Sequence, residues 1–107
     1  MIISGGENVS SIEVEDALFS HPAVLETAVI GVPHEKWGET VMALVVLVPG
    51  SEATERDLID HCRELIAHYK CPTSVEFRIE LARTATGKLQ KYKLRTPYWE
   101  GMEKQIN

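Results

Sequence analysis

The segment Val41-Met42-Ala43-Leu44-Val45-Val46-Leu47-Val48 is apolar throughout, and Pro49-Gly50 follows it directly. An apolar run of this length that ends at a Pro-Gly turn is typical of a buried strand. We therefore predict a strand over residues 41–48 that lies centrally in a sheet.

Two further strands are predicted, one on each side of this segment in the sequence. Residues 27–33 (TAVIGVP) are rich in β-branched side chains, which indicates a second buried strand. Residues 74–81 alternate between polar and apolar side chains, which predicts a third strand with one face open to water. The inward-facing residues of this third strand would be Val75, Phe77, Ile79 and Leu81.

Helix starts and helical periodicity predict two helices, in chain order one before the first of these strands and one between the second and the third. Ser10 and Glu13 have the Ser-x-x-Glu spacing of a capping box, in which each side chain accepts a hydrogen bond from a backbone amide of the first turn. Proline at position 22 would stop this helix. A second cap is predicted at residues 54–57, and the clearest amphipathic pattern of the chain follows it and ends before Pro72. Its apolar face would consist of Leu58, Ile59, Cys62, Leu65, Ile66 and Tyr69.

This order of elements predicts an α+β domain. Its centre would be a small, mainly antiparallel three-stranded sheet with helices packed on it, preceded by a short N-terminal β-hairpin or loop. All residues, 1–107, would form a single domain. Because the chain opens in the middle of a motif, we expect it to be a piece cut from a longer protein.

Composition sets limits on the class of protein. The formal net charge is −5, with 44% hydrophobic and 25% charged residues, as in an ordinary globular domain. The acidic balance argues against nucleic acid as the main partner. No apolar run is long enough to span a bilayer and no signal peptide is recognisable, so we expect a cytoplasmic setting. Cys62 and Cys71 are interpreted as free thiols, and the scattered histidines predict no metal site.

A basic segment stands out against this acidic background. Residues 83–95 carry five cations and no acid. Gly87 can adopt a backbone angle closed to other residues, and apolar residues then recur at helical spacing, so Lys88 would lie at a loop-to-helix junction suited to an anion. The motif of a phosphate loop is excluded, because Ala82 and Leu89 occupy the positions of its first glycine and its hydroxyl. On charge alone the segment also fits a solvated basic helix.

Several stretches together resemble the C-terminal domain of the adenylate-forming enzymes, the superfamily of acyl-CoA synthetases, nonribosomal-peptide adenylation domains and luciferases. Each match is weak alone, and their common order and spacing over nearly the whole chain make the resemblance specific. The matching stretches are residues 2–9 (IISGGENV), Glu13 and Glu15, and residues 21–24 (HPAV), 29–33 (VIGVP), 37–39 (WGE), 69–72 (YKCP) and 83–88 (RTATGK).

The resemblance implies a reaction in two halves. A carboxylate attacks ATP to give an acyl-adenylate and pyrophosphate, and the thiol of CoA then displaces AMP to give a thioester. Between the halves the C-terminal domain would swing on a larger N-terminal AMP-binding domain and present a different face to one active site. ATP and CoA would be substrates, and Mg²⁺ would accompany ATP in the N-terminal domain, which this chain lacks. The isolated chain is therefore expected to bind no cofactor and to be inactive.

Residue roles follow from the same resemblance. Lys88 matches the lysine that enters the site for adenylation, where a fixed ammonium would stabilise developing negative charge. Gly87 would let its loop come close. Four residues match the loop that enters for thioester formation and lines the pantetheine tunnel, where a glycine leaves room for a narrow thioalkyl chain. These residues are Gly5, Gly6, Glu7 and Asn8.

Three further positions match residues that lie around the CoA nucleotide in some CoA ligases. Trp37 and Tyr69 would offer aromatic faces to adenine, and Lys70 would offer a cation to phosphate. Cys71 stands where some members carry a basic residue, and Ala82 where many have proline. If that basic residue binds the nucleotide phosphates in those family members, this chain must use another cation for them.

The same features leave three functions open. The sequence favours the domain of an acyl-CoA synthetase acting on a fatty or short-to-medium-chain acid, with the acyl-adenylate passing between the halves. One alternative is the equivalent domain of a peptide synthetase or a luciferase-like enzyme. The other is a stand-alone, non-catalytic binding module of similar fold.

Overall fold

The computed structural model describes residues 2–36, 38–82 and 90–100. Trp37, Gly87 and Lys88 therefore lie outside the described residues. The elements run along the chain in the order β1 (Ile2–Ser4), β2 (Glu7–Val9), α1 (Ser11–Phe19), β3 (Val24–His34), β4 (Gly38–Leu47), α2 (Glu55–Leu65), the 3₁₀-helix η1 (His68–Lys70), β5 (Ser74–Phe77) and α3 (Lys91–Trp99).

The α+β prediction is confirmed, and the sheet is larger than the three strands expected. Its order is β2-β1-β4-β3, and β5 pairs with β4 on the same edge as β1. The pairs β1–β2, β1–β4 and β3–β4 are antiparallel, whereas β4–β5 is parallel. The predicted N-terminal hairpin is thus part of the sheet, and β4 is its central strand, as its apolar sequence indicated.

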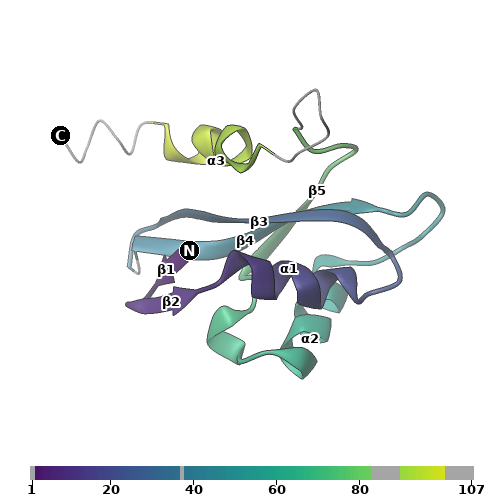
Figure 1. Cartoon of the computed structure of the whole chain (residues 1–107), viewed down its shortest axis with the longest axis horizontal. Coiled ribbons are helices and arrows are strands. Elements are labelled where there is room, and N and C mark those ends of the chain that lie inside the picture. Colours follow the sequence, from purple (N-terminus) through teal and green to yellow (C-terminus); the bar gives the residue numbers. More distant parts are fainter. Residues whose placement is uncertain (1, 37, 83–89, 101–107) are drawn as a thin grey trace.

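Helices cover both faces of the sheet (Figure 1). On one face, under α1 and α2, lies a core cluster that includes Val29 of β3 and Val41, Ala43 and Val45 of β4. The alternate residues of the same strands, such as Ile30 and Leu44, belong to a second cluster that α3 covers through Leu94. Burial on both faces explains why β3 and β4 are almost continuously apolar instead of alternating.

The two predicted helix caps differ in outcome. The cap at Thr54 is a complete capping box: Asp57 N donates to Thr54 Oγ1 at 3.1 Å, and Thr54 N donates to Asp57 Oδ2 at 2.9 Å. Ser10 Oγ accepts from Glu13 N at 3.4 Å. The carboxylate of Glu13 does not complete this box and instead binds Lys70, so the first capping box is only half formed.

The end of α2 falls earlier than the periodicity predicted. The helix stops at Leu65, because Ile66 has an extended backbone with φ −134° and ψ 165°. Tyr69 therefore belongs to η1, and its side chain is exposed and not part of the apolar face of α2. Ending the helix here lets the chain turn and place η1 before β5.

The strand predicted over residues 74–81 is also shorter, because β5 ends at Phe77. Ile79 is 95% exposed, which overturns its assignment to the core, and Phe77 is exposed as well. Val75 packs against the cluster under α1 and α2, while Leu81 belongs to the cluster under α3. The chain crosses from one face of the sheet to the other between these residues, so the period of two could not continue.

Side chains at the end of α3 contact the sheet. Trp99 Nε1 donates to Gly31 O of β3 at 2.8 Å, and Tyr98 donates to the carboxylate of Glu76 on β5. Arg78 also donates to Tyr98 Oη, at 3.0 Å. These contacts hold α3 over the second core cluster.

None of the helices in the described part of the chain is both long and apolar enough to cross a membrane.

Candidate functional site

The glycine turn predicted to serve the thioester half joins β1 to β2. Ser4 pairs with Glu7, so Gly5 and Gly6 are the two central residues of the hairpin. Their φ angles are +58° and +84°. Positive φ at both central positions is the pattern of a type I′ turn, which other residues adopt at a cost. A Cβ added at Gly6 would meet no atom within 4 Å, so the backbone conformation and not packing in this domain requires glycine there.

A pocket of about 380 Å³ brings this turn next to η1. Two predicted site regions, far apart in the sequence, thus meet in space. The described residues that line the pocket are Ser4, Gly5, Glu7, Arg63, His68, Tyr69, Cys71 and Thr73. Tyr69 is half exposed, so part of its side chain is open to a ligand in this pocket.

Three of the predicted residues that the structure describes, Gly6, Asn8 and Lys70, do not line this pocket. Asn8 is exposed on β2 and pairs with Ile3. Lys70 Nζ lies 2.9 Å and 3.2 Å from the two carboxylate oxygens of Glu13 and 5.7 Å from the centre of the Tyr69 ring. The hydrogen bond to Glu13 raises the pKa of Lys70, so this ammonium is charged and already paired.

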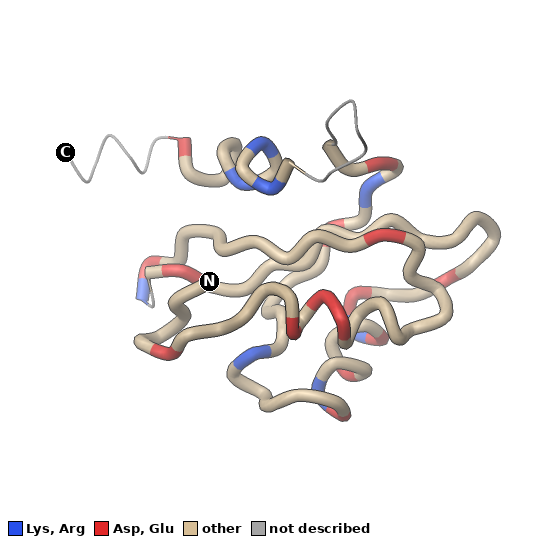
Figure 2. Tube along the Cα trace, viewed as in Figure 1, with Lys and Arg blue, Asp and Glu red and all other residues tan. Residues whose placement is uncertain are grey.

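The basic segment is described only at its two ends. Gln90 N donates to Ala82 O at 3.0 Å, so the residues that flank segment 83–89 lie together. Helix α3 then begins at Lys91, later than the junction predicted at Lys88. The Lys and Arg residues of α3 and the acids along α1 lie in opposite layers of the domain (Figure 2).

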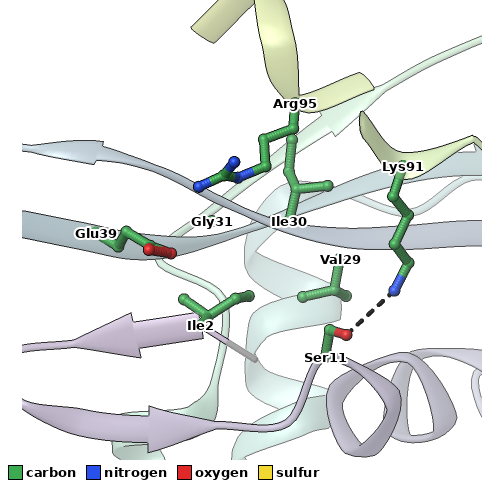
Figure 3. Close-up of a pocket in the computed structure, with 8 residues that line it drawn as sticks. All are labelled: Ile2, Ser11, Val29, Ile30, Gly31, Glu39, Lys91 and Arg95. Atoms are coloured by element: carbon green, nitrogen blue, oxygen red, sulfur yellow. Dashed lines mark hydrogen bonds between the residues drawn. The ribbon is translucent and has the colours of Figure 1, made fainter. Parts of the chain in front are cut away.

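Lys91 connects these two layers around the edge strand β3. Its Nζ lies 2.6 Å from Glu15 Oε2 and 3.1 Å from Ser11 Oγ of α1. The same Glu15 oxygen accepts a hydrogen bond from Val29 N at 2.9 Å, which satisfies a backbone amide of β3. Figure 3 shows Lys91 reaching from α3 to Ser11 across a second pocket, of about 370 Å³.

No role was predicted for Lys91, although one signal was present. The first turn of α3 has no acid and no side-chain cap, and a cation there opposes the helix dipole. A lysine at the start of a helix is better tolerated when another element supplies its counter-charge, as Glu15 does here. Arg63 gave no such signal, because it lies on the polar face of an ordinary amphipathic helix.

Comparison with known proteins identifies the family. The model of the AMP-binding enzyme C-terminal domain matches residues 13–88. This chain therefore belongs to the AMP-binding enzyme C-terminal domain family. The matched region includes Tyr69, Lys70 and the basic segment up to Lys88, and the hairpin precedes it.

Several relatives of this chain are named as CoA ligases. A Humulus lupulus protein described as a probable CoA ligase is 54% identical over 97 residues, which cover 89% of this chain and 17% of the relative. The peroxisomal trans-cinnamate:CoA ligase of Petunia hybrida is 48% identical over 95 residues, with the same two shares. The crystal structure of the Brucella canis acyl-CoA synthetase matches with a TM-score of 0.89 and 38% identity, over 94% of this chain and 19% of that one. The chain thus spans about a fifth of the length of these proteins.

Burial should protect the thiols of Cys62 and Cys71 in this domain from chemical modification. Burial, and next the neighbouring Cys71, raise the pKa of Cys62 to about 12, and burial raises that of Cys71. With a pKa of about 12, only about one Cys62 in ten thousand is a thiolate at pH 8. We expect a thiol reagent such as DTNB to react slowly with the native domain at pH 8 and with two thiols per chain in urea. Rapid reaction of the native domain would contradict this burial.

Proposed function

We propose that this chain is the mobile C-terminal domain of an AMP-forming acid–CoA ligase and works on the active site of an AMP-binding domain in the same protein. Lys88 would stabilise the transition state of adenylation, in which the carboxylate attacks the α-phosphate and pyrophosphate leaves. The hairpin turn would then line the path of the CoA thiol, which attacks the acyl carbonyl and displaces AMP. Family membership supports this assignment, because the matched region extends to Lys88.

One observation carries the CoA half of the proposal. The turn of Gly5 and Gly6, with positive φ at both residues, borders the same pocket as the half-exposed ring of Tyr69. A side-chain-free turn beside an aromatic face suits a ligand with a narrow arm and a flat base. The names of the relatives favour CoA over a carrier-protein arm, because they include benzoate–, butyrate– and 4-hydroxybutyrate–CoA ligases.

The choice of acid would be made outside this domain. Relatives named for aromatic and for short aliphatic acids are similarly close, at 48% identity for the benzoate enzyme and 52% for the butyrate enzyme. The sequence identity in this domain therefore does not depend on which acid the relative is named for. We propose a carboxylic acid as substrate, with the fatty acids favoured by the sequence as one class within it.

The test is to assay the full-length protein that carries this sequence with ATP, Mg²⁺, CoA and a panel of aromatic and aliphatic acids. The proposal predicts acid-dependent release of AMP and pyrophosphate in equal amounts, with one acyl-CoA formed for each AMP. Release of ADP and phosphate, or no thioester with any acid, would contradict it.

Trp37→Ala in the full-length protein should raise the KM for CoA about tenfold, because stacking of a base on an aromatic ring is worth about 1–3 kcal/mol. The KM for ATP should change little. Steady-state kinetics with CoA or ATP as the varied substrate would check this. Unfolding of the variant, seen by circular dichroism, would instead assign Trp37 to the core of the domain.

A further inference from the structure

The pocket beside the hairpin turn contains two basic side chains among its described lining residues. Arg63 lies in the last turn of α2, and His68 begins η1. Both residues are exposed. The acid in the lining, Glu7, begins β2 and so belongs to the hairpin side. The cationic end of the pocket is therefore formed by α2 and η1.

Arg63 is free to bind an anion, whereas Lys70 is not. Both carboxylate oxygens of Glu13 already contact the Lys70 ammonium. Within residues 2–36, 38–82 and 90–100, no acidic side chain forms an ion pair with Arg63. An unpaired guanidinium can offer two parallel N–H donors to a phosphate, a geometry that a single ammonium lacks.

The lining residues lie on two sides of the pocket, which would suit the two ends of CoA. The glycine turn lies at the hairpin side, where the thioalkyl arm would pass, and Arg63 and His68 come from the elements on which Tyr69 and Cys71 also lie. Burial raises the pKa of Cys71, and the nearby charge of Arg63 opposes part of this rise. This places its charge beside the position where the sequence lacks a basic residue.

We infer that Arg63, assisted by His68, binds the phosphate groups of the CoA nucleotide in the pocket between the hairpin turn and η1. This inference rests on the proposed function, because it requires CoA to be the thiol substrate. The alternative role of Arg63 is structural, since a cation in the last turn of a helix interacts favourably with the helix dipole. That role would affect the stability of α2 and would not depend on which thiol reacts.

The decisive experiment uses two thiol acceptors, CoA and pantetheine, which lacks the nucleotide and its phosphates. In the full-length protein, Arg63→Gln should raise the KM for CoA by about ten- to a hundredfold, the range for a lost charge-assisted hydrogen bond. The KM for pantetheine should stay the same. Arg63→Lys should recover part of the loss, and His68→Gln should have a smaller effect in the same direction.

Arg56→Gln is the matched control, because Arg56 lies in the first turn of the same helix, pairs with Asp60 at 3.6 Å and has an 81% exposed side chain. This control substitution should change neither the KM for CoA nor the KM for pantetheine. Equal effects of Arg63→Gln on CoA and pantetheine, or no effect on either, would overturn the inference and leave the proposed function standing. A wild-type protein that forms no thioester with CoA would overturn the proposed function, and the inference with it.

Discussion

Replacing Lys88 with alanine should slow acyl-adenylate formation by about a hundred- to a thousandfold, which is the usual effect of removing one preorganised group that stabilises transition-state charge. The same variant should convert supplied acyl-adenylate and CoA to thioester at close to the normal rate. The reason is that Lys88 would enter the active site only for the first half-reaction, in which negative charge builds up on the phosphate oxygens. Single-turnover measurements of each half-reaction in the full-length protein would separate the two effects.

Lys93→Ala provides the control for charge. Lys93 is an exposed residue of α3 and belongs to the same basic segment, so its removal changes the net charge equally. It should leave both half-reactions intact. If Lys88→Ala slowed both halves equally, the lysine would act on general binding or on domain placement, and its assignment to adenylation would be wrong.

Gly6→Leu should have the opposite pattern and abolish most thioester formation while adenylation continues. Two causes act together: leucine is strained at the observed φ of +84°, and its side chain would project from the turn that lines the proposed path of the thiol. A Cβ at this position meets nothing within 4 Å, so the domain itself has room for it. Acyl-adenylate should therefore accumulate in the presence of CoA, which rapid quench and chromatography would detect.

Gly50→Leu is a closely matched control for backbone strain. Gly50 has φ +83° and also has no atom within 4 Å of an added Cβ, but it lies in the turn after β4. Both variants should lose similar amounts of stability, and only Gly6→Leu should lose thioester formation. Equal activity losses in the two variants would show that strain, and not obstruction, causes the effect. A selective loss of adenylation in Gly6→Leu would contradict the assignment of the hairpin to thioester formation.

The centre of the fold was predictable because its sequence signals are local. An uninterrupted apolar run gave the central strand β4, and Thr54 with Asp57 marked the start of α2. The errors occur where long-range contacts decide the structure. Ile79 was assigned to the core because its spacing continues that of Val75, but the chain changes faces of the sheet before Leu81.

In the candidate site, the structure shows where the described residues lie, and their roles stay predictions. Resemblance to a family located the glycine turn and Tyr69, and the structure places both at one pocket. The partners of the lysines could not be read from spacing, since Lys70 and Glu13 are 57 residues apart and Lys91 and Ser11 are 80 apart. Arg63 became a candidate only when the fold brought α2 next to the hairpin.

The central claim is that this domain works within a larger AMP-binding enzyme, and the mass of the native protein tests it most directly. An antibody against the 107-residue domain would detect the protein in a cell extract, and its size would be read by immunoblot and mass spectrometry. Because the domain covers 17–20% of its curated relatives, we predict a single chain several times heavier than the domain. A native product of the size of the domain alone would contradict the claim, because no AMP-binding domain would then share its chain.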